Sequence, residues 1–172
     1  MPTSVAKRKV KASRKTHKAG GDLWAGVLKL TNPLLRLYQS APMERIELVK
    51  AGAPAVFVYY LLADMSISRE RLYTTVGVAR ATIDRKVRAG GRLNPNESER
   101  ILDVARLVGQ VEQMVAESGT ASHFDAGKWV ADWLDSPLPA LGGKRPGSLM
   151  DTSEGRSLVS DLLAQMQSGA YA

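Results

Sequence analysis

Residues 68–90, with the sequence SRERLYTTVGVARATIDRKVRAG, indicate the fold more directly than any other stretch of the chain. They read as a short helix, a turn and a second helix, which is the arrangement of a helix-turn-helix motif. Gly77 stands at the turn, where the backbone needs a residue that tolerates positive φ. Apolar side chains recur where the two helices must touch, namely at Leu72, Val76, Val78, Ile83 and Val87. We therefore predict a helix-turn-helix motif over Arg69 to Arg88.

The outer face of the second predicted helix is basic. At the helical period, Arg80, Ala81, Asp84, Arg85 and Arg88 share a sector of about 140°, opposite Ile83 and Val87. Residues 66–92 hold seven arginines and lysines against two acidic residues, a net charge of +5.

DNA binding is the preferred interpretation of this face. We expect contacts to phosphates or guanine edges from Arg80, Arg85 and Arg88, with Thr82 or Lys86 touching the DNA backbone. The alternative is a solvated ion-pair ladder through Arg80, Asp84 and Arg88. Tyr73 and Lys86 depart from the usual motif, which has a small residue at the first position and an apolar one at the second.

Helical spacing dominates the rest of the chain, and the fold class predicted is all-α. Two helical segments are expected between Leu23 and Tyr38, meeting near Asn32 and Pro33, and another helix from Pro54 to Asp64. A long helix is expected to open at Asn96, with Glu99 completing a capping box. Its apolar stripe comprises Ile101, Val104, Ala105, Val108, Val111 and Val115.

The charge of the chain is concentrated at its start. Residues 1–21 carry seven of the 24 basic residues and no acid, so the remainder has 17 basic and 17 acidic residues. Such an aromatic-free segment is expected to be a disordered basic arm, serving either as a solvated leader or as an electrostatic contact to DNA. The predicted domains are this arm over 1–21, a helical segment over 22–50, a helix-turn-helix domain over 51–117 and a further domain over 118–172.

Several classes of function find no support in the sequence. Without cysteine, disulfide and thiolate chemistry are excluded, and His17 and His123 cannot form a metal cluster. Gly143 and Lys144 are followed by Arg145, which does not match a phosphate-binding P-loop, and no nucleophile elbow is present. The longest apolar run, residues 51–63, is too short to span a membrane. We expect a cytoplasmic protein that is not an enzyme and has no cofactor or metal.

The region after Gly119 is predicted to contain two further helices joined by a glycine-rich loop. The first carries Trp129, Val130, Trp133 and Leu134 as core residues and stops at Ser136 and Pro137. The second is expected to be capped by Asp151 with Glu154, or by Thr152, and to end at Gly169. Between them, Gly142 and Gly143 allow a tight bend and Pro146 fixes its exit.

The last forty residues resemble the C-terminal toxin-binding domain of Xre/MbcA/ParS-type antitoxins, and VGVARATIDRKVRAGGRLNPNESERILDVARL upstream resembles their Xre-type helix-turn-helix. Together the resemblance covers about residues 50–172. The matching positions are Trp133, Leu134, Pro137, Leu141, Gly142, Gly143, Arg145, Pro146, Thr152, Gly155 and Gly169.

This resemblance implies an antitoxin encoded beside a RES-domain toxin, an NAD-depleting enzyme similar in fold to ADP-ribosyltransferases. The pocket-blocking end would be Gly169, Ala170, Tyr171 and Ala172, supported by a toxin-contact loop of Leu141, Gly142, Gly143, Lys144, Arg145 and Pro146. The antitoxin would also repress its own operon by binding operator DNA as a homodimer, or as a higher hetero-oligomer with the toxin. The alternatives are a frayed C-terminal end and a stand-alone regulator whose C-terminal domain only dimerises.

Overall fold

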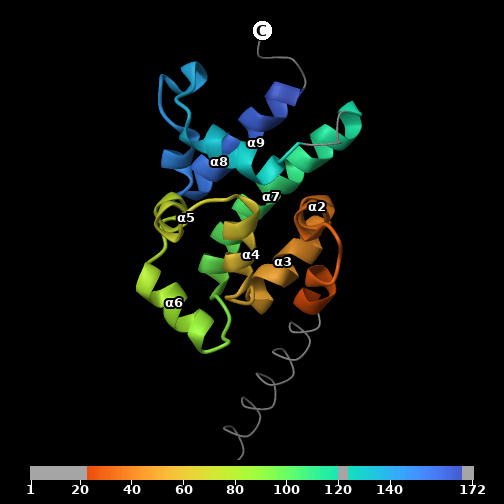
Figure 1. Ribbon diagram of the computed structural model, residues 1–172, viewed down its shortest axis with the longest axis vertical. Helices are drawn as coiled ribbons and strands as arrows, with labels where there is room; N and C mark the ends of the chain where they lie inside the picture. The colour runs from red at the N-terminus through yellow and green to blue at the C-terminus, as the bar shows by residue number, and fades with distance from the viewer. Residues whose placement is uncertain (1–22, 120–123, 168–172) are drawn as a thin grey trace, which may run out of the picture.

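The computed structural model describes residues 23–119 and 124–167, and within these ranges it consists of helices with isolated bridges and no strand (Figure 1). Residues 23–28 form a first helical stretch. The helices that follow are α2 (Pro33–Gln39), α3 (Pro42–Ala51), α4 (Phe57–Asp64), α5 (Arg69–Val76), α6 (Arg80–Arg88), α7 (Pro95–Ser118), α8 (Ala126–Asp135), η2 (Pro139–Leu141), η3 (Pro146–Leu149) and α9 (Ser153–Gln167). The all-α prediction is confirmed.

The long helix α7 runs through the middle of the molecule, and α2, α3, α8 and α9 all pack against it (Figure 1). Its predicted apolar stripe is buried from Ile101 to Val111, and Val115 is partly buried. The predicted start of this helix is wrong by two residues. Asn94 is the cap, and its side chain and that of Glu97 exchange hydrogen bonds of 2.8 Å with each other's backbone N–H. Pro95, which lacks an N–H, fits the first helical position better than a position before the cap.

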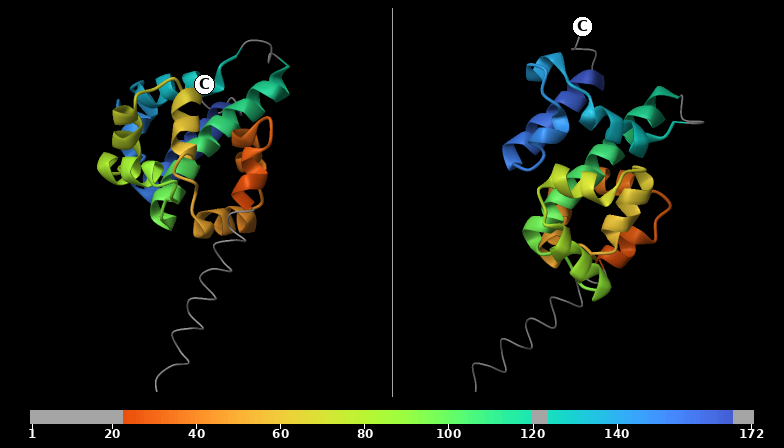
Figure 2. Two further views of the ribbon diagram at one scale, coloured as in Figure 1. Left: turned by 60° about the horizontal axis from the view of Figure 1, so that its bottom comes forward. Right: turned by 60° about the vertical axis from the view of Figure 1, so that its left-hand side comes forward.

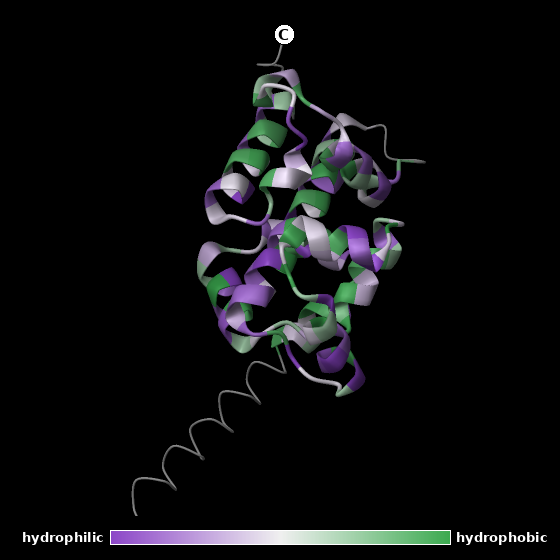
Figure 3. Ribbon diagram, turned by 90° about the vertical axis from the view of Figure 1, so that its left-hand side faces the viewer, coloured by the Kyte–Doolittle hydropathy of each residue, from purple (hydrophilic) through white to green (hydrophobic). Residues whose placement is uncertain are grey.

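The elements on either side of α7 form two ends of one molecule. Helices α3 and α6 lie at one end, and α8 and α9 lie at the other (Figures 1 and 2). Figure 3 looks at the side on which α5 and α6 lie, and hydrophilic residues are prominent in its lower half. A continuous apolar core joins the two ends, because Ile101, Val130 and Leu163 belong to the same buried cluster.

The N-terminal helical segments pack closely on this core. They meet near Asn32 and Pro33 as predicted, and the buried Trp24 donates a 3.0 Å hydrogen bond to the Leu48 carbonyl. Helix α2 approaches α7 so closely that the Leu34 carbonyl fills the space a side chain at Gly109 would need. None of the helices in the described ranges has the length and apolar character required to cross a lipid bilayer.

Candidate functional sites

The helix-turn-helix motif is formed by α5 and α6. The Ser68 side chain caps α5 by accepting a hydrogen bond from the Arg71 N–H, and Gly77 ends the helix with φ of 63°. A side chain at Gly77 would also meet Arg100 Nη1 at 2.8 Å, so two independent constraints favour glycine at the turn. Buried Leu72, Val76 and Ile83 hold α6 against the rest of the domain. The predicted motif is confirmed.

The basic face of α6 is exposed as predicted. Arg80, Arg85 and Arg88 are all exposed, whereas Thr82 is half-buried. Arg80 Nε lies 3.4 Å from Asp84 Oδ2, and Arg88 Nε donates a 3.3 Å hydrogen bond to the Asp84 carbonyl. Only the Arg80–Asp84 contact is an ion pair of the predicted ladder, because Arg88 reaches the backbone carbonyl of Asp84 rather than its carboxylate. Both contacts are long and cost little to release. The Arg85 side chain makes no hydrogen bond or ion pair with the described part of the chain, so its guanidinium is available to a partner.

Tyr73 and Lys86, the two departures from the usual motif, both have structural roles. Tyr73 is buried and its hydroxyl donates a 3.3 Å hydrogen bond to Asp84 Oδ1, which ties α5 to α6. Burial, helped by the neighbouring Asp84 carboxylate, raises the pKa of Tyr73 to about 12, so the phenol stays neutral. Lys86 forms an ion pair with Glu97 of the α7 capping box. A DNA contact by Lys86 would first require its release from that pair.

Sequence reasoning missed two residues beside the start of α6. Asn96 and Arg100 of α7 line the same hollow of about 240 Å³ as Thr82. Arg100 Nη1 donates a 2.8 Å hydrogen bond to the Val76 carbonyl at the end of α5. Arg100 and Val76 lie 24 positions apart in sequence, and only the packing of α7 against the motif brings them together.

The loop between α8 and α9 is a closed, ordered structure. The Leu138 and Gly143 amides donate hydrogen bonds of 3.1 Å to the Lys144 carbonyl and 2.9 Å to the Leu138 carbonyl, respectively. Gly142 and Gly143 adopt φ of 62° and 81°, which confirms the predicted tight bend. The two glycines, Lys144 and Arg145 are exposed, Leu141 is half-buried and Pro146 is buried. The loop thus presents two neighbouring cations from a fixed backbone.

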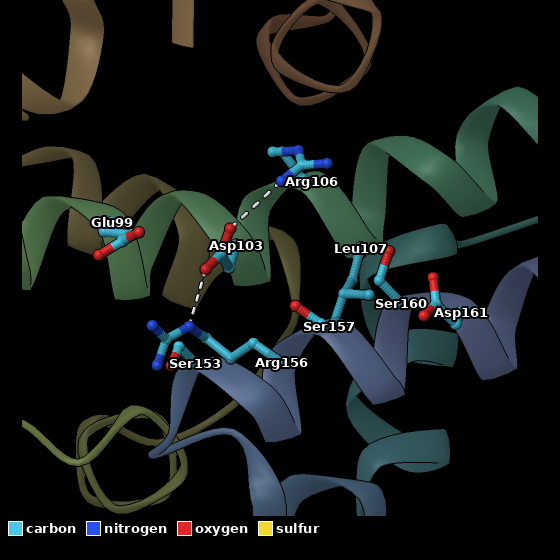
Figure 4. Close-up of a pocket in the computed structure, with 9 residues that line it drawn as sticks. All are labelled: Glu99, Asp103, Arg106, Leu107, Ser153, Arg156, Ser157, Ser160 and Asp161. Atoms are coloured by element: carbon cyan, nitrogen blue, oxygen red, sulfur yellow. Dashed lines mark hydrogen bonds and ion pairs between the residues drawn. The ribbon is translucent and has the colours of Figure 1, made fainter. Parts of the chain in front are cut away.

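Helix α9 is anchored to α7 by Arg156, a residue that sequence reasoning did not single out. Arg156 is only 7% exposed, and its Nε lies 2.7 Å from Asp103 Oδ2 (Figure 4). Arg106 approaches the other carboxylate oxygen at 3.3 Å, so one acid serves two arginines. Both pairs border a polar hollow of about 380 Å³ between α7 and α9.

Two alternative caps were predicted for the start of α9, and the structure has one of them. Thr152 Oγ1 accepts a 3.0 Å hydrogen bond from the Gly155 N–H, so Thr152 is the cap and the alternative built on Asp151 and Glu154 is wrong. The Leu149 carbonyl and Thr152 Oγ1 also crowd the space where a side chain at position 155 would lie, so only glycine fits there. The predicted pocket-blocking residues, Gly169, Ala170, Tyr171 and Ala172, lie outside the described residues, as does the predicted basic arm.

The core of the C-terminal end contains the residues predicted for it. Trp133 and Leu134 of α8 are buried, and the Trp133 ring stacks on Trp129 with centroids 6.0 Å apart. Contacts from α5 hold this end to the helix-turn-helix: Arg71 pairs with Asp135 at 2.7 Å and donates a hydrogen bond to the Ala131 carbonyl. Among the residues in the described ranges, no group of three or more histidines and acids is placed to hold a metal ion.

Comparisons with known proteins agree with this two-part architecture. A family described as "Antitoxin Xre-like helix-turn-helix domain" matches residues 44–106, and one described as "Antitoxin Xre/MbcA/ParS C-terminal toxin-binding domain" matches residues 122–169. The first match contains α4, α5 and α6, and the second contains the loop with its two cations.

Two named relatives match over most of the chain. A protein named "Prs ADP-ribosylating antitoxin" from Sphingobium sp. (strain YBL2) is 42% identical over 136 residues, which cover 79% of this chain and 86% of that protein. "Antitoxin Xre" from Yersinia enterocolitica (serotype O:8 / biotype 1B) is 31% identical over 106 residues, which cover 62% of this chain and 66% of that protein. The chain therefore belongs to the Xre/MbcA/ParS family of antitoxins, with an Xre-like helix-turn-helix domain followed by the C-terminal domain of that family.

Proposed function

We propose that this antitoxin neutralises a RES-type toxin, an enzyme that consumes NAD, by occupying its NAD pocket. The observation that carries the proposal is the closed loop of residues 138–144, whose fixed backbone presents the exposed Lys144 beside the exposed Arg145, ahead of α9. A rigid loop loses little conformational entropy on binding, which favours its use as a contact surface. Lys144 and Arg145 suit an acidic rim on the toxin.

The chain's last residues suit the interior of such a pocket. Gly169, Ala170 and Ala172 are small, and Tyr171 adds one aromatic ring, which suits a concave and mostly apolar pocket. The name of the Sphingobium relative associates it with ADP-ribosylation of Prs. Because NAD is the usual donor of ADP-ribose, that name supports a toxin whose pocket binds NAD.

Co-expression with the product of a neighbouring RES-type gene tests this function. The full chain should suppress NAD loss and ADP-ribosyl transfer to cellular proteins, and deletion of residues 170–172 should restore one of these activities. Persistent neutralisation by the truncated chain would contradict pocket blocking. If transfer without net NAD loss is seen, the toxin is a transferase, as the relative's name suggests, rather than an NAD-degrading enzyme.

Reversing the charge of the two loop cations distinguishes a toxin contact by the loop from one by the C-terminal residues. Lys144→Glu with Arg145→Glu should weaken toxin binding by tenfold or more while the helical circular dichroism signal stays unchanged. Lys128→Glu is the matched control, because Lys128 is also an exposed cation of the C-terminal end but lies on α8, away from the loop. Equal losses in the two variants would indicate general electrostatic attraction rather than a contact by the loop.

We further propose that the protein represses its own operon by placing α6 in the major groove of operator DNA. The exposed, unpaired Arg85 favours this role more than any other residue of the helix-turn-helix. Arg85→Ala should lower affinity for promoter DNA by about tenfold or more, the range of about 1–3 kcal/mol for a bidentate base contact. Lys128→Ala should leave the affinity unchanged.

Removal of residues 1–21 tests whether the basic arm takes part. If the arm contacts phosphates, the salt dependence of DNA affinity becomes shallower on its removal, because fewer counterions are released. We propose that the protein acts in the cytoplasm, where operator and toxin both occur, and reads a palindromic operator as a homodimer.

A further inference from the structure

One face of α3 is unusually open. Leu48 is the only buried residue of this ten-residue helix, whereas Met43 is 66% exposed and Ile46 is 42% exposed. Met43, Ile46, Glu47 and Lys50 are all exposed and recur at helical spacing along the outer side. This set, the α3 stripe, gives the helix apolar surface on the side that does not face the core.

We propose that the α3 stripe is the surface through which two copies of this chain pair in antiparallel fashion. The spacing of the stripe reads the same in both directions, because Met43 and Lys50 flank Ile46 and Glu47 symmetrically about a midpoint between them. Such a pattern satisfies the requirement of a two-fold interface, in which one patch must complement itself. The Lys50 stem would cover the Met43 of the second copy, and the two Ile46 side chains would meet near the axis.

The electrostatics of the region permit this pairing. Glu47 and Lys50 lie 3.7 Å apart within one chain and cancel each other's charge, so two stripes do not repel. Beside Ile46, a hollow of about 370 Å³ lies between α3 and α7. Arg45 and Arg106 balance Glu99 and Asp103 in its lining, and the charge of Lys50 is balanced by Glu47, so the hollow has no net charge that would repel a second copy.

The position of α3 argues for a second copy rather than a toxin as the occupant. Helices α3 and α6 lie at the same end of the molecule, away from α8 and α9 (Figures 1 and 2). Pairing through α3 therefore keeps both loops of residues 138–144 free. This inference rests on the proposed reading of a palindromic operator and names the surface that would make the dimer.

The absence of cysteine from the chain gives a direct test. Ile46→Cys introduces a single thiol about 1.5 Å along α3 from its copy in the proposed dimer, within disulfide reach, whereas Met43→Cys thiols would be roughly 10 Å apart along the axis. Leu158→Cys is the matched control, because Leu158 is 45% exposed but lies on α9 at the other end. Each full-length variant is oxidised at micromolar concentration, without toxin, and disulfide-linked dimer is measured on a non-reducing gel.

We expect the Ile46→Cys protein to cross-link at least tenfold faster than the Met43→Cys and Leu158→Cys proteins, and Ile46→Lys to convert dimer to monomer in sedimentation experiments with unchanged helicity. Equal rates at the three positions, faster reaction at position 158, or a parent chain that is monomeric would each overturn the proposal. A monomer that still neutralises its toxin would refute this surface while leaving the proposed neutralisation intact.

Discussion

The loss of stability on breaking the Arg156–Asp103 pair should depend on which of the two partners is replaced. Arg156→Met removes the cation but leaves Asp103 24% exposed in its side chain and still 3.3 Å from Arg106. Breaking a buried pair costs about 3–5 kcal/mol, and the remaining partner lowers this to about 2 kcal/mol. In a chain of 172 residues this corresponds to a fall in Tm of roughly 4–8 °C.

Asp103→Leu should cost more, about 3–4 kcal/mol, because it leaves the 7% exposed Arg156 with only the Met150 carbonyl at 3.3 Å. The double variant should be less destabilised than the sum of the two single variants, by about 1–2 kcal/mol. Urea unfolding followed by circular dichroism measures all three. Additive losses, or a larger loss for Arg156→Met than for Asp103→Leu, would refute the reasoning.

Arg36 and Glu44 provide the control for burial. Their N–O distance is also 2.7 Å, but their side chains are 39% and 32% exposed. Arg36→Met should therefore cost less than about 1 kcal/mol, since exposed pairs contribute little. Equal losses for Arg36→Met and Arg156→Met would show that distance, rather than burial, determines the contribution.

Three further substitutions test the packing and the buried charge. Gly109→Ala should lower stability by about 2 kcal/mol in urea unfolding, because crowding of the Leu34 carbonyl outweighs the better helix propensity of alanine. Gly26→Ala, with nothing within 4 Å, should instead raise it by about 0.5–1 kcal/mol, so a shared sign would contradict the packing argument. Burial, and then the nearby Asp125, raises the pKa of Asp64, so ionised Asp64 destabilises the folded state at neutral pH. Asp64→Asn should therefore raise Tm at pH 7, and its advantage should shrink as the pH falls through the raised pKa, whereas a pH-independent difference would refute this origin.

Local features of the fold could be predicted from the sequence because local spacing determines them. The turn at Gly77 and the stripe from Ile101 to Val111 depend on neighbours within one or two helical turns. Helix starts were harder to place. The pairs Asn94–Glu97 and Asn96–Glu99 have the same spacing, and the choice between them depends on Pro95 and on an ion pair from Lys86.

The contacts that assemble the sites could not be predicted, because their partners are far apart in sequence. Arg156 and Asp103 are separated by 53 positions, and Arg71 and the Ala131 carbonyl by 60. No periodicity selects these pairs. The charged face of α6 was predictable from the helical period, but the burial of Tyr73 and the ion pair between Lys86 and Glu97 depend on how separate helices pack.

The contacts between α5 and the C-terminal end limit which domains of related antitoxins can be joined to this helix-turn-helix. Arg71 supplies both a counter-charge to Asp135 and a donor to the Ala131 carbonyl, and a Cβ at Gly77 would make a tight contact of 3.0 Å with the Asp151 Cβ. A chimera that joins this helix-turn-helix to another antitoxin's last fifty residues would inherit half of each contact. Exchange of toxin specificity between relatives should therefore succeed only when the residues on both sides of this contact are transferred together. The helix-turn-helix and the C-terminal domain are then expected to be inherited as a pair.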